Sequence, residues 1–244
     1  MMRKLGILGG VSWNSTALYY EQINRATAAR LGGLHSAPLA IESLDFAPVA
    51  AMQQAGDWDG VTGLAVEAAV RLKKSGCDGL LIASNTMHKT AGAVKAATKL
   101  PLIDIGAVTA ERLVADGVSR IALLGTNYTM TEEFARDAYL ARGLALVDLS
   151  PAWRGEVHRI IYEELAAGRV VRESQRKLRT LITEMSRQKV QAIVLGCTEL
   201  VMAVDVRANV LPVYDTTALH ARAAVEWIFG DAEAAEQDGE RAAA

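Results

Sequence analysis

The chain has 244 residues, 26 Lys and Arg against 28 Asp and Glu, a formal net charge of −2, and 51% hydrophobic residues. This composition is typical of a folded globular protein and excludes a disordered chain or a small disulfide scaffold. A near-neutral charge without a long basic cluster argues against nucleic-acid binding. No apolar run reaches the roughly 18 residues that span a bilayer, and only two cysteines are present. We therefore expect a cytoplasmic protein with free thiols and no membrane contact.

Short apolar runs alternate with longer segments of helical periodicity along the chain. This pattern is typical of βα units around a parallel sheet, so the predicted fold class is α/β. The expected strands are residues 5–8, 39–43, 79–83, 102–103, 120–124, 145–149, 192–195 and 211–213. The expected helices are residues 15–30, 58–75, 91–98, 107–116, 131–142, 155–167, 173–188 and 217–229.

Landmarks recur in the same order in the two halves of the chain, which indicates an internal duplication. The pairs are a glycine that ends a strand, a small polar or thiol residue after a strand, and an aspartate that closes a strand: Gly9 with Gly125, Ser84 with Cys197, and Asp104 with Asp215. We predict two similar α/β domains, residues 1–104 with 215–244 and residues 105–214, related by pseudo-twofold symmetry. Ligands bind outside the carboxyl ends of parallel strands, so the active site is expected in the cleft between the domains.

Cys197 lies in the sequence LGCTE, where a strand turns into a helix. Helix N-terminal amides stabilise a thiolate, so Cys197 is a candidate activated cysteine; a buried structural thiol is the alternative. Ser84 begins the sequence SNT at the matching turn. Its hydroxyl, amide and backbone N–H groups could hold a substrate carboxylate, unless they only cap a helix. Cys77 has no counterpart in the repeat and is expected in the core.

The glycine-rich segment GILGGVS, residues 6–12, lacks the spacing of nucleotide-binding loops, so ATP and NAD are not expected. It is either a tight turn that brings backbone close to a small anion, or a turn that needs glycine only for its backbone angles. The four histidines form no metal-ligand grouping, so no metal is expected. His88 could orient a substrate or be an ordinary hydrogen-bonded residue. Asp104 and Asp215 are expected to be caps at the strand ends rather than catalytic acids.

Three motifs together resemble the aspartate/glutamate racemase superfamily: GxxGGxSW at residues 6–13, SNTMHK at 84–89 and GCTE at 196–199. The resemblance is closest to the bacterial L-aspartate/glutamate-specific, broad-specificity amino-acid racemases. It extends over residues 5–229. It implies an isomerase that racemises an amino acid without pyridoxal phosphate or another cofactor, and that is commonly a homodimer.

The resemblance also implies a two-base mechanism, in which one residue removes the α-proton and another delivers a proton to the opposite face. Both bases are usually cysteines; here Cys197 matches one, and Ser84 stands at the other, as a native serine or an engineered replacement. A hydroxyl is a poor base without an activating partner, so Ser84 is expected to be the weaker base. By the same resemblance, the residues that hold or line the substrate are Asn85, Thr86 and Thr198 at the carboxylate, and Val11, Gln53, Thr126 and Glu199 around it.

The substrate stays open at this stage. Aspartate racemases carry an arginine after the second strand and a lysine on a second-half helix, whereas residues 45–54 and 163–167 contain neither. Their absence argues against aspartate and glutamate, so a small polar neutral amino acid of the homoserine type competes with these two, and Gln53 would hydrogen-bond its side chain. Two other functions also remain: a single-cysteine decarboxylase or isomerase of the same superfamily, and a non-catalytic amino-acid-binding protein.

Overall fold

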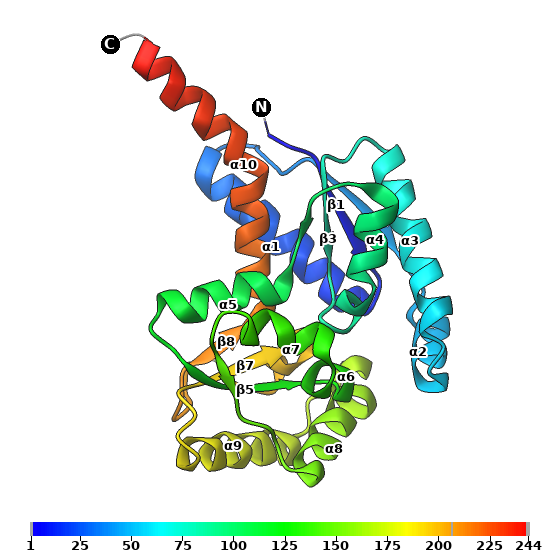
Figure 1. The fold of residues 1–244 in the computed structure, drawn as a ribbon, viewed down its shortest axis with the longest axis vertical. Helices are drawn as coiled ribbons and strands as arrows, with labels where there is room; N and C mark the ends of the chain where they lie inside the picture. Colours follow the sequence, from blue (N-terminus) through cyan, green and yellow to red (C-terminus); the bar gives the residue numbers. More distant parts are fainter. Residues whose placement is uncertain (1, 206, 243–244) are drawn as a thin grey trace. The chain divides into compact units, whose positions relative to one another are not determined.

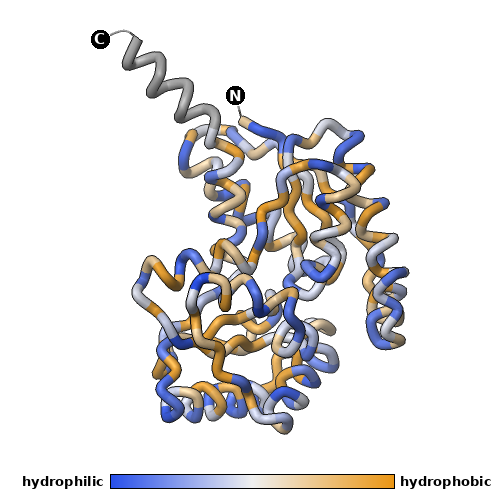
Figure 2. Tube along the Cα trace, viewed as in Figure 1, coloured by the Kyte–Doolittle hydropathy of each residue, from blue (hydrophilic) through white to orange (hydrophobic). Residues whose placement is uncertain are grey.

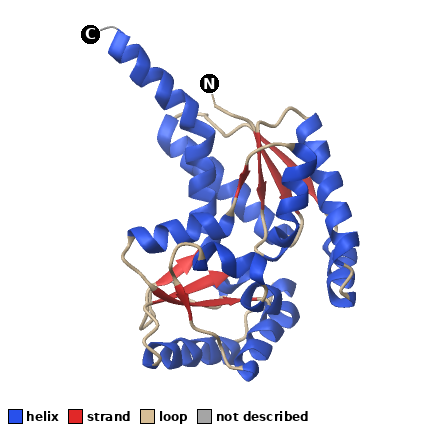
Figure 3. Cartoon of the chain, in the orientation of Figure 1, coloured by secondary structure: helices blue, strands red, loops and turns tan. Residues whose placement is uncertain are grey.

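The computed structural model describes residues 2–205 and 207–242, with side chains described as far as residue 230 (Figure 3). The strands are β1 (Leu5–Gly9), β2 (Leu39–Ser43), β3 (Gly79–Ile82), β4 (Leu102–Ile103), β5 (Arg120–Gly125), β6 (Ala145–Leu146), β7 (Ala192–Gly196) and β8 (Val213–Asp215). Within the described part of the chain, no helix is both long and apolar enough to cross a bilayer.

Among the described residues, ten α-helices and four short helical segments accompany these strands. The α-helices are α1 (Trp13–Leu31), α2 (Phe46–Ala55), α3 (Trp58–Lys74), α4 (Ala91–Thr98), α5 (Ile105–Ala115), α6 (Asn127–Thr131), α7 (Glu133–Leu140), α8 (Pro151–Arg159), α9 (Arg172–Arg187) and α10 (Thr216–Ala242). The short segments are η1 (Thr86–Thr90), the π-helix η2 (Ile160–Glu164), η3 (Leu165–Ala167) and η4 (Thr198–Met202).

The chain forms two compact units. The first comprises Met1–Ala83, Thr90–Ile103 and His220–Ala244, and the second comprises Ser84–Lys89 and Asp104–Leu219. The chain therefore passes from one unit to the other four times. Residues 84–89 group with the second unit, whereas the domain boundaries predicted from the sequence place them in the first.

Each unit contains one four-stranded parallel sheet, and the two sheets have the same strand order. The order is β2-β1-β3-β4 in the first unit and β6-β5-β7-β8 in the second. Figure 1 labels β1 and β3 of the first sheet and β5, β7 and β8 of the second. The matching order agrees with the repeat seen in the sequence and confirms the predicted α/β fold class. Short apolar strands joined by helices produce this topology because parallel neighbours require a crossover connection.

Both central strands of the second sheet are covered on two faces. Every residue of β7, with the sequence AIVLG, is buried, as are all residues of β5 except Arg120. Figure 2 colours the Cα trace by hydropathy and shows hydrophobic segments in this unit. Strands buried on both faces read as continuous hydrophobic runs, which is why these two were visible in the sequence. One face packs against α8, η2 and α9, and the other against α5 and α7.

The first sheet is also packed on both faces. Leu5 and Ile7 of β1 contact α1 and α10 in one hydrophobic cluster. The other face meets α3, whose buried residues recur at helical spacing: Val61, Ala65, Ala68, Ala69 and Leu72. Gly6 permits this close approach, because an added Cβ would lie 3.1 Å from Leu72 Cβ.

Several predicted elements differ from the structure. The helix expected at 131–142 is the shorter α7, and the unexpected helix α6 ends just before it, because Glu132 adopts an extended conformation (φ −91°, ψ 148°) between the two. The helix expected at 155–167 begins earlier, at Pro151, with Ser150 as its N-cap, and continues as η2 and η3. Helix α2 was not expected; it contains Pro48, but a proline in the first turn interrupts no helical hydrogen bond. Strand β6 is shorter than predicted, and β8 lies two residues later.

Candidate functional site

The carboxyl ends of β5 and β7 define the candidate site in the second unit. These strands are neighbours, with Gly125 opposite Gly196, while the chain leaves β5 toward β6 on one side and β7 toward β8 on the other. Ligands of open parallel sheets bind where the strand order reverses in this way. Thr126 follows β5 and Cys197 follows β7, so both lie at this point of the sheet.

A cluster of threonine hydroxyls holds residues 84–89 against the carboxyl end of β5. Thr86 Oγ1 lies 3.0 Å from Thr126 Oγ1 and 3.4 Å from Thr129 Oγ1, and the last two lie 3.2 Å apart. All three residues are buried. Thr126 also accepts the backbone N–H of Thr129 as N-cap of α6. The cluster fixes the segment that contains Ser84 to the end of β5.

Asn85 fixes the same segment to the end of β7. Its Nδ2 donates to Thr216 Oγ1 at 3.0 Å, and the Thr216 hydroxyl donates to the Leu195 carbonyl oxygen at 2.8 Å. Thr216 is fully buried at the start of α10. Thr216 therefore links the Asn85 side chain to the backbone of Leu195, two positions before Cys197.

His88 anchors the backbone of Ser84. The Ile105 N–H at the start of α5 donates to His88 Nε2 at 3.2 Å, so Nε2 is the unprotonated nitrogen, and Nδ1–H donates to the Ser84 carbonyl oxygen at 2.7 Å. Both ring nitrogens of His88 are thus in hydrogen bonds within the protein, which fits an ordinary hydrogen-bonded residue better than one that orients a substrate. The Ser84 hydroxyl itself accepts the Met87 N–H at 3.4 Å, which is a capping contact.

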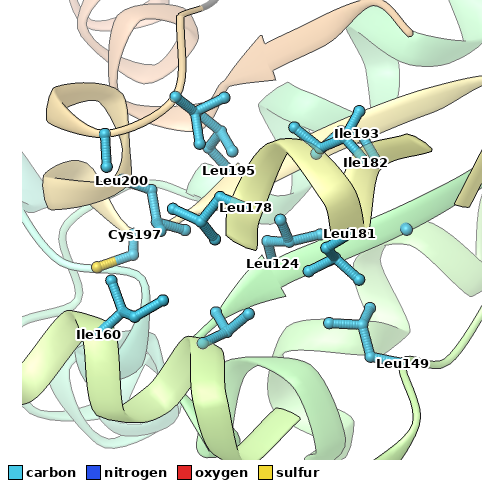
Figure 4. Close-up of a cluster of buried hydrophobic side chains, with 14 of the residues drawn as sticks. Leu124, Leu149, Ile160, Leu178, Leu181, Ile182, Ile193, Leu195, Cys197 and Leu200 are labelled. Atoms are coloured by element: carbon cyan, nitrogen blue, oxygen red, sulfur yellow. The ribbon is translucent and has the colours of Figure 1, made fainter. Parts of the chain in front are cut away.

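Cys197 and Glu199 form a buried pair. Cys197 Sγ donates to Glu199 Oε2 at 2.9 Å, and each residue is 8% exposed. Figure 4 shows Cys197 at the margin of a hydrophobic cluster near Ile160 and Leu200. Burial, and then the charge and hydrogen bond of Glu199, raise the pKa of the Cys197 thiol well above its ordinary value. The backbone amides of Glu199 and Leu200 lower that pKa by less, so burial and the facing carboxylate outweigh the stabilisation of a thiolate by these amides.

Aromatic residues adjoin the pair. Tyr162 of the π-helix packs against the cluster that contains Cys197. Its pKa is raised by burial first, and then by Tyr128, Cys197 and Glu199. The rings of Tyr162 and His158 are 4.7 Å apart. His158 Nδ1 accepts the backbone N–H of Asn127, and burial lowers the pKa of His158. These neighbours are therefore uncharged near neutral pH.

The structure brings most of the predicted site residues into the second unit. The residues in this unit are Ser84, Asn85, Thr86, Thr126, Cys197, Thr198 and Glu199. Thr198 is buried at the start of η4. Val11 and Gln53 are buried in the first unit, Gln53 on α2, and their roles stay predictions.

The predictions for other single residues have clear outcomes. Asp104 accepts the Ala107 N–H at 2.8 Å and Asp215 accepts the Thr217 N–H at 2.9 Å, which confirms both as helix caps. Cys77 is buried, as expected for a core residue. Among the residues that the structure describes, no group of three His, Cys, Asp or Glu side chains could hold a metal ion.

Sequence reasoning missed three residues that shape the site: Thr129, Thr216 and Tyr162. Thr216 directly follows Asp215 of the repeat, which was a usable signal. Thr129 packs over the ends of β5 and β7, because a Cβ added at Gly125 would lie 3.0 Å from Thr129 Cβ. The position of Tyr162 depends on the π-helix, which no sequence pattern indicated.

Known proteins share this architecture and sequence. A crystal structure of a proposed Asp/Glu racemase from Yersinia pestis is 40% identical, with a TM-score of 0.87, covering 93% of this chain and 100% of that one. An aspartate racemase homologue from Pyrococcus horikoshii OT3 is 29% identical, with a TM-score of 0.79, covering 92% and 98%. The broad specificity amino-acid racemase RacX of Bacillus subtilis (strain 168) is 23% identical over 169 residues, which are 69% of this chain and 73% of RacX. Residues 8–224 match the Asp/Glu/hydantoin racemase family. The chain therefore belongs to the Asp/Glu/hydantoin racemase family.

Proposed function

We propose that this protein is a cofactor-independent amino-acid racemase whose substrate is aspartate, glutamate or a small polar amino acid. The observation that carries the proposal is the buried Cys197–Glu199 pair at the end of β7, beside the segment of Ser84, Asn85 and Thr86. A thiol is a suitable acid and base for an α-proton, and the neighbouring hydroxyl and amide groups suit a carboxylate.

The substrate carboxylate is assigned to the hydroxyl and amide groups of Asn85, Thr86 and Thr198. Thr86 belongs to a preformed hydroxyl cluster, and Asn85 is held by Thr216. Donors that are already oriented require little reorganisation when negative charge develops on the carboxylate of the α-carbanion. This supports carbanion formation without a cofactor that acts as an electron sink.

Cys197 takes the α-proton of the L-enantiomer in this proposal, and the Ser84 side, directly or through water, supplies a proton to the opposite face. The Ser84 hydroxyl accepts a backbone N–H, and a hydroxyl without an activating base is a weak acid and base. Because the enantiomers have equal free energies, kcat/KM must be the same in both directions. A weak Ser84 therefore slows both directions equally.

Incubation in D₂O with separate L- and D-amino acids, acidic and neutral, tests the function. Deuteration is followed by NMR and enantiomer ratio by chiral chromatography. We expect inversion with deuterium incorporation, loss of both in Cys197→Ala, and faster inversion in Ser84→Cys. Ser84→Ala is the matched control, because it removes the hydroxyl without adding a base.

Two other outcomes would favour the alternatives. Exchange of the L α-proton without inversion would mean that Cys197 acts alone. If neither the wild type nor Ser84→Cys exchanges the α-proton of any amino acid, racemisation is refuted. Release of carbon dioxide from a disubstituted malonate would then indicate a decarboxylase. Saturable binding of an amino acid without exchange would indicate a non-catalytic binding protein. We also propose a homodimer, for which light scattering should give twice the chain mass of 26.1 kDa.

A further inference from the structure

Helix α1 carries an exposed apolar stripe in addition to its buried face. On the buried face, Tyr19 and Ile23 pack in one cluster with β1 and α10. The exposed stripe lies about 120° around the helix from that face. It includes Trp13, Tyr20 and Leu31, whose exposed fractions are 68%, 51% and 42%. Single exposed apolar residues are ordinary, but a row of them along one helix marks an interaction surface.

The stripe is continuous along the whole helix. Its members follow one another at intervals of three or four residues, so each lies about one turn from the next. From its first to its last member the stripe is about 27 Å long. The half-buried members are Asn24 and Ala28, and the exposed ones are Trp13, Ala17, Tyr20 and Leu31.

The free edge of the first sheet extends this stripe. Asn24 Oδ1 accepts the Ala37 N–H at 2.9 Å, so the stripe runs beside β2, which is the edge strand. Ile41 of β2 is 40% exposed and lies on the same face of the strand as Leu39, which packs in the cluster of α1. Leu34, between α1 and β2, is fully exposed. We call this area the α1–β2 surface, which comprises Trp13, Ala17, Tyr20, Asn24, Ala28, Leu31, Leu34 and Ile41.

The stripe has the same pattern in both directions. Its members form three pairs, each centred between residues 22 and 23 or on residue 22: Trp13 with Leu31, Ala17 with Ala28, and Tyr20 with Asn24. If a second α1 lies antiparallel across a twofold axis, the members of each pair face one another. The large residues then meet at the two ends, and the alanines let the helices approach closely. A twofold interface requires such self-complementarity.

The charges beside the stripe are also self-complementary. Glu21 and Arg25 lie on one flank of the stripe and form an exposed ion pair within the helix at 2.6 Å. A twofold axis perpendicular to two antiparallel helices brings the same flank of each helix together. Glu21 then faces the partner's Arg25, twice in each dimer. A flank with one sign of charge would instead repel its own copy.

We propose that the α1–β2 surface is the contact between two copies of this chain, with the two α1 helices antiparallel. The proposal rests on the homodimer proposed above and assigns its surface. It does not depend on the racemase activity. The pattern of the stripe and the charges on its flank favour a second copy over an unrelated protein as the occupant.

Ala17→Glu tests the surface, with Ala96→Glu as the matched control. Both alanines are exposed on helices of the first unit, and Ala96 lies on α4, which packs with α3 on the other face of the sheet. A glutamate at position 17 places a charge from each copy in an apolar contact, where it loses its hydration. In sedimentation equilibrium of the full chain, Ala17→Glu should raise the Kd of the dimer by on the order of 100-fold. Ala96→Glu should leave it unchanged, and both variants should keep the wild-type circular dichroism.

Charge reversal tests the antiparallel arrangement. Glu21→Arg alone, or Arg25→Glu alone, places like charges opposite one another and should raise the Kd on the order of 10-fold at low salt. The double variant, Glu21→Arg with Arg25→Glu, restores opposite charges and should recover the wild-type Kd. A double variant that dimerises no better than the single ones overturns the antiparallel contact.

The remaining outcomes separate the surface from the homodimer. A dimer whose Kd is the same in Ala17→Glu and in the wild type overturns this surface and keeps the homodimer. A wild type that stays monomeric up to about 1 mM, where even weak association is detected, refutes both and leaves the surface to a different protein. The α-proton exchange in D₂O tests the racemase function separately.

Discussion

Two adjacent threonines allow a direct test of how the Asn85 segment is held. Thr216 and Thr217 are both buried at the start of α10, with exposed fractions of 0% and 1%. The Thr216 hydroxyl makes two hydrogen bonds, to Asn85 and to the Leu195 carbonyl. The Thr217 hydroxyl has no hydrogen-bond partner among the residues that the structure describes. Valine replaces either residue with nearly the same shape.

Thr216→Val should lower the free energy of unfolding of the second unit by about 2 kcal/mol, from two neutral hydrogen bonds worth about 1 kcal/mol each. A loss of this size lowers Tm by about 4 to 8 °C in a protein of this length. Thr217→Val should instead stabilise, by about 1 kcal/mol, because a buried unpaired hydroxyl is costly. Urea unfolding and calorimetry measure both variants. Equal effects of the two substitutions, or a stable Thr216→Val, would refute the assignment of the hydrogen bonds.

Three further predictions concern packing and charge. Gly125→Ala should destabilise by about 1 to 3 kcal/mol in urea unfolding, since the new Cβ would lie 2.8 Å from the backbone carbonyl oxygen of Gly196; wild-type stability would contradict the strand contact. Gly63→Ala, exposed on α3 with no atom within 4 Å of the new Cβ, should stabilise by up to about 1 kcal/mol in the same assay. Hydrogen bonds from Arg159, and then from Lys177, lower the pKa of Glu156 to about 2. The ionised carboxylate therefore stabilises the fold fully at pH values above its unfolded pKa of 4.5, and this stabilisation is lost as the pH falls toward 2. Arg159→Gln should raise the pKa of Glu156 toward 4.5 in a carboxyl NMR titration and move acid unfolding to higher pH; an unchanged titration would show that the ion pair is not formed in solution.

The central strands and the repeat could be predicted because they depend on local pattern. Strands such as β7 are apolar throughout and end in glycine, and the same landmarks in both halves predicted two similar domains, in agreement with the shared strand order. Cys197 could also be selected, because its place after a strand is local information. The elements that were not predicted correctly depend on local conformation. The extended Glu132 separates α6 from α7, and Pro48 is compatible with helix α2 because it lies in the first turn, which the sequence does not reveal until the start of the helix is known.

The protonation of the candidate site could not be predicted in the same way. The sequence contains Cys197 and Glu199 two positions apart, but it does not say that both side chains are buried and in contact. Burial and a facing carboxylate raise the pKa of the thiol and outweigh the helix amides, whose effect was the one visible in the sequence. The contact between Thr86 and Thr126 spans 40 residues and is likewise a product of the fold.

The four crossings of the chain between the units limit how the protein can be taken apart. A fragment of residues 104–219 would contain the whole second sheet and Cys197, yet it would lack residues 84–89, which belong to the same unit. Thr126, Thr129 and Thr216 would then lose the side chains that they contact. Chimaeras between family members should therefore exchange residues 84–89 together with 104–219, because these two separate sequence segments form one structural unit.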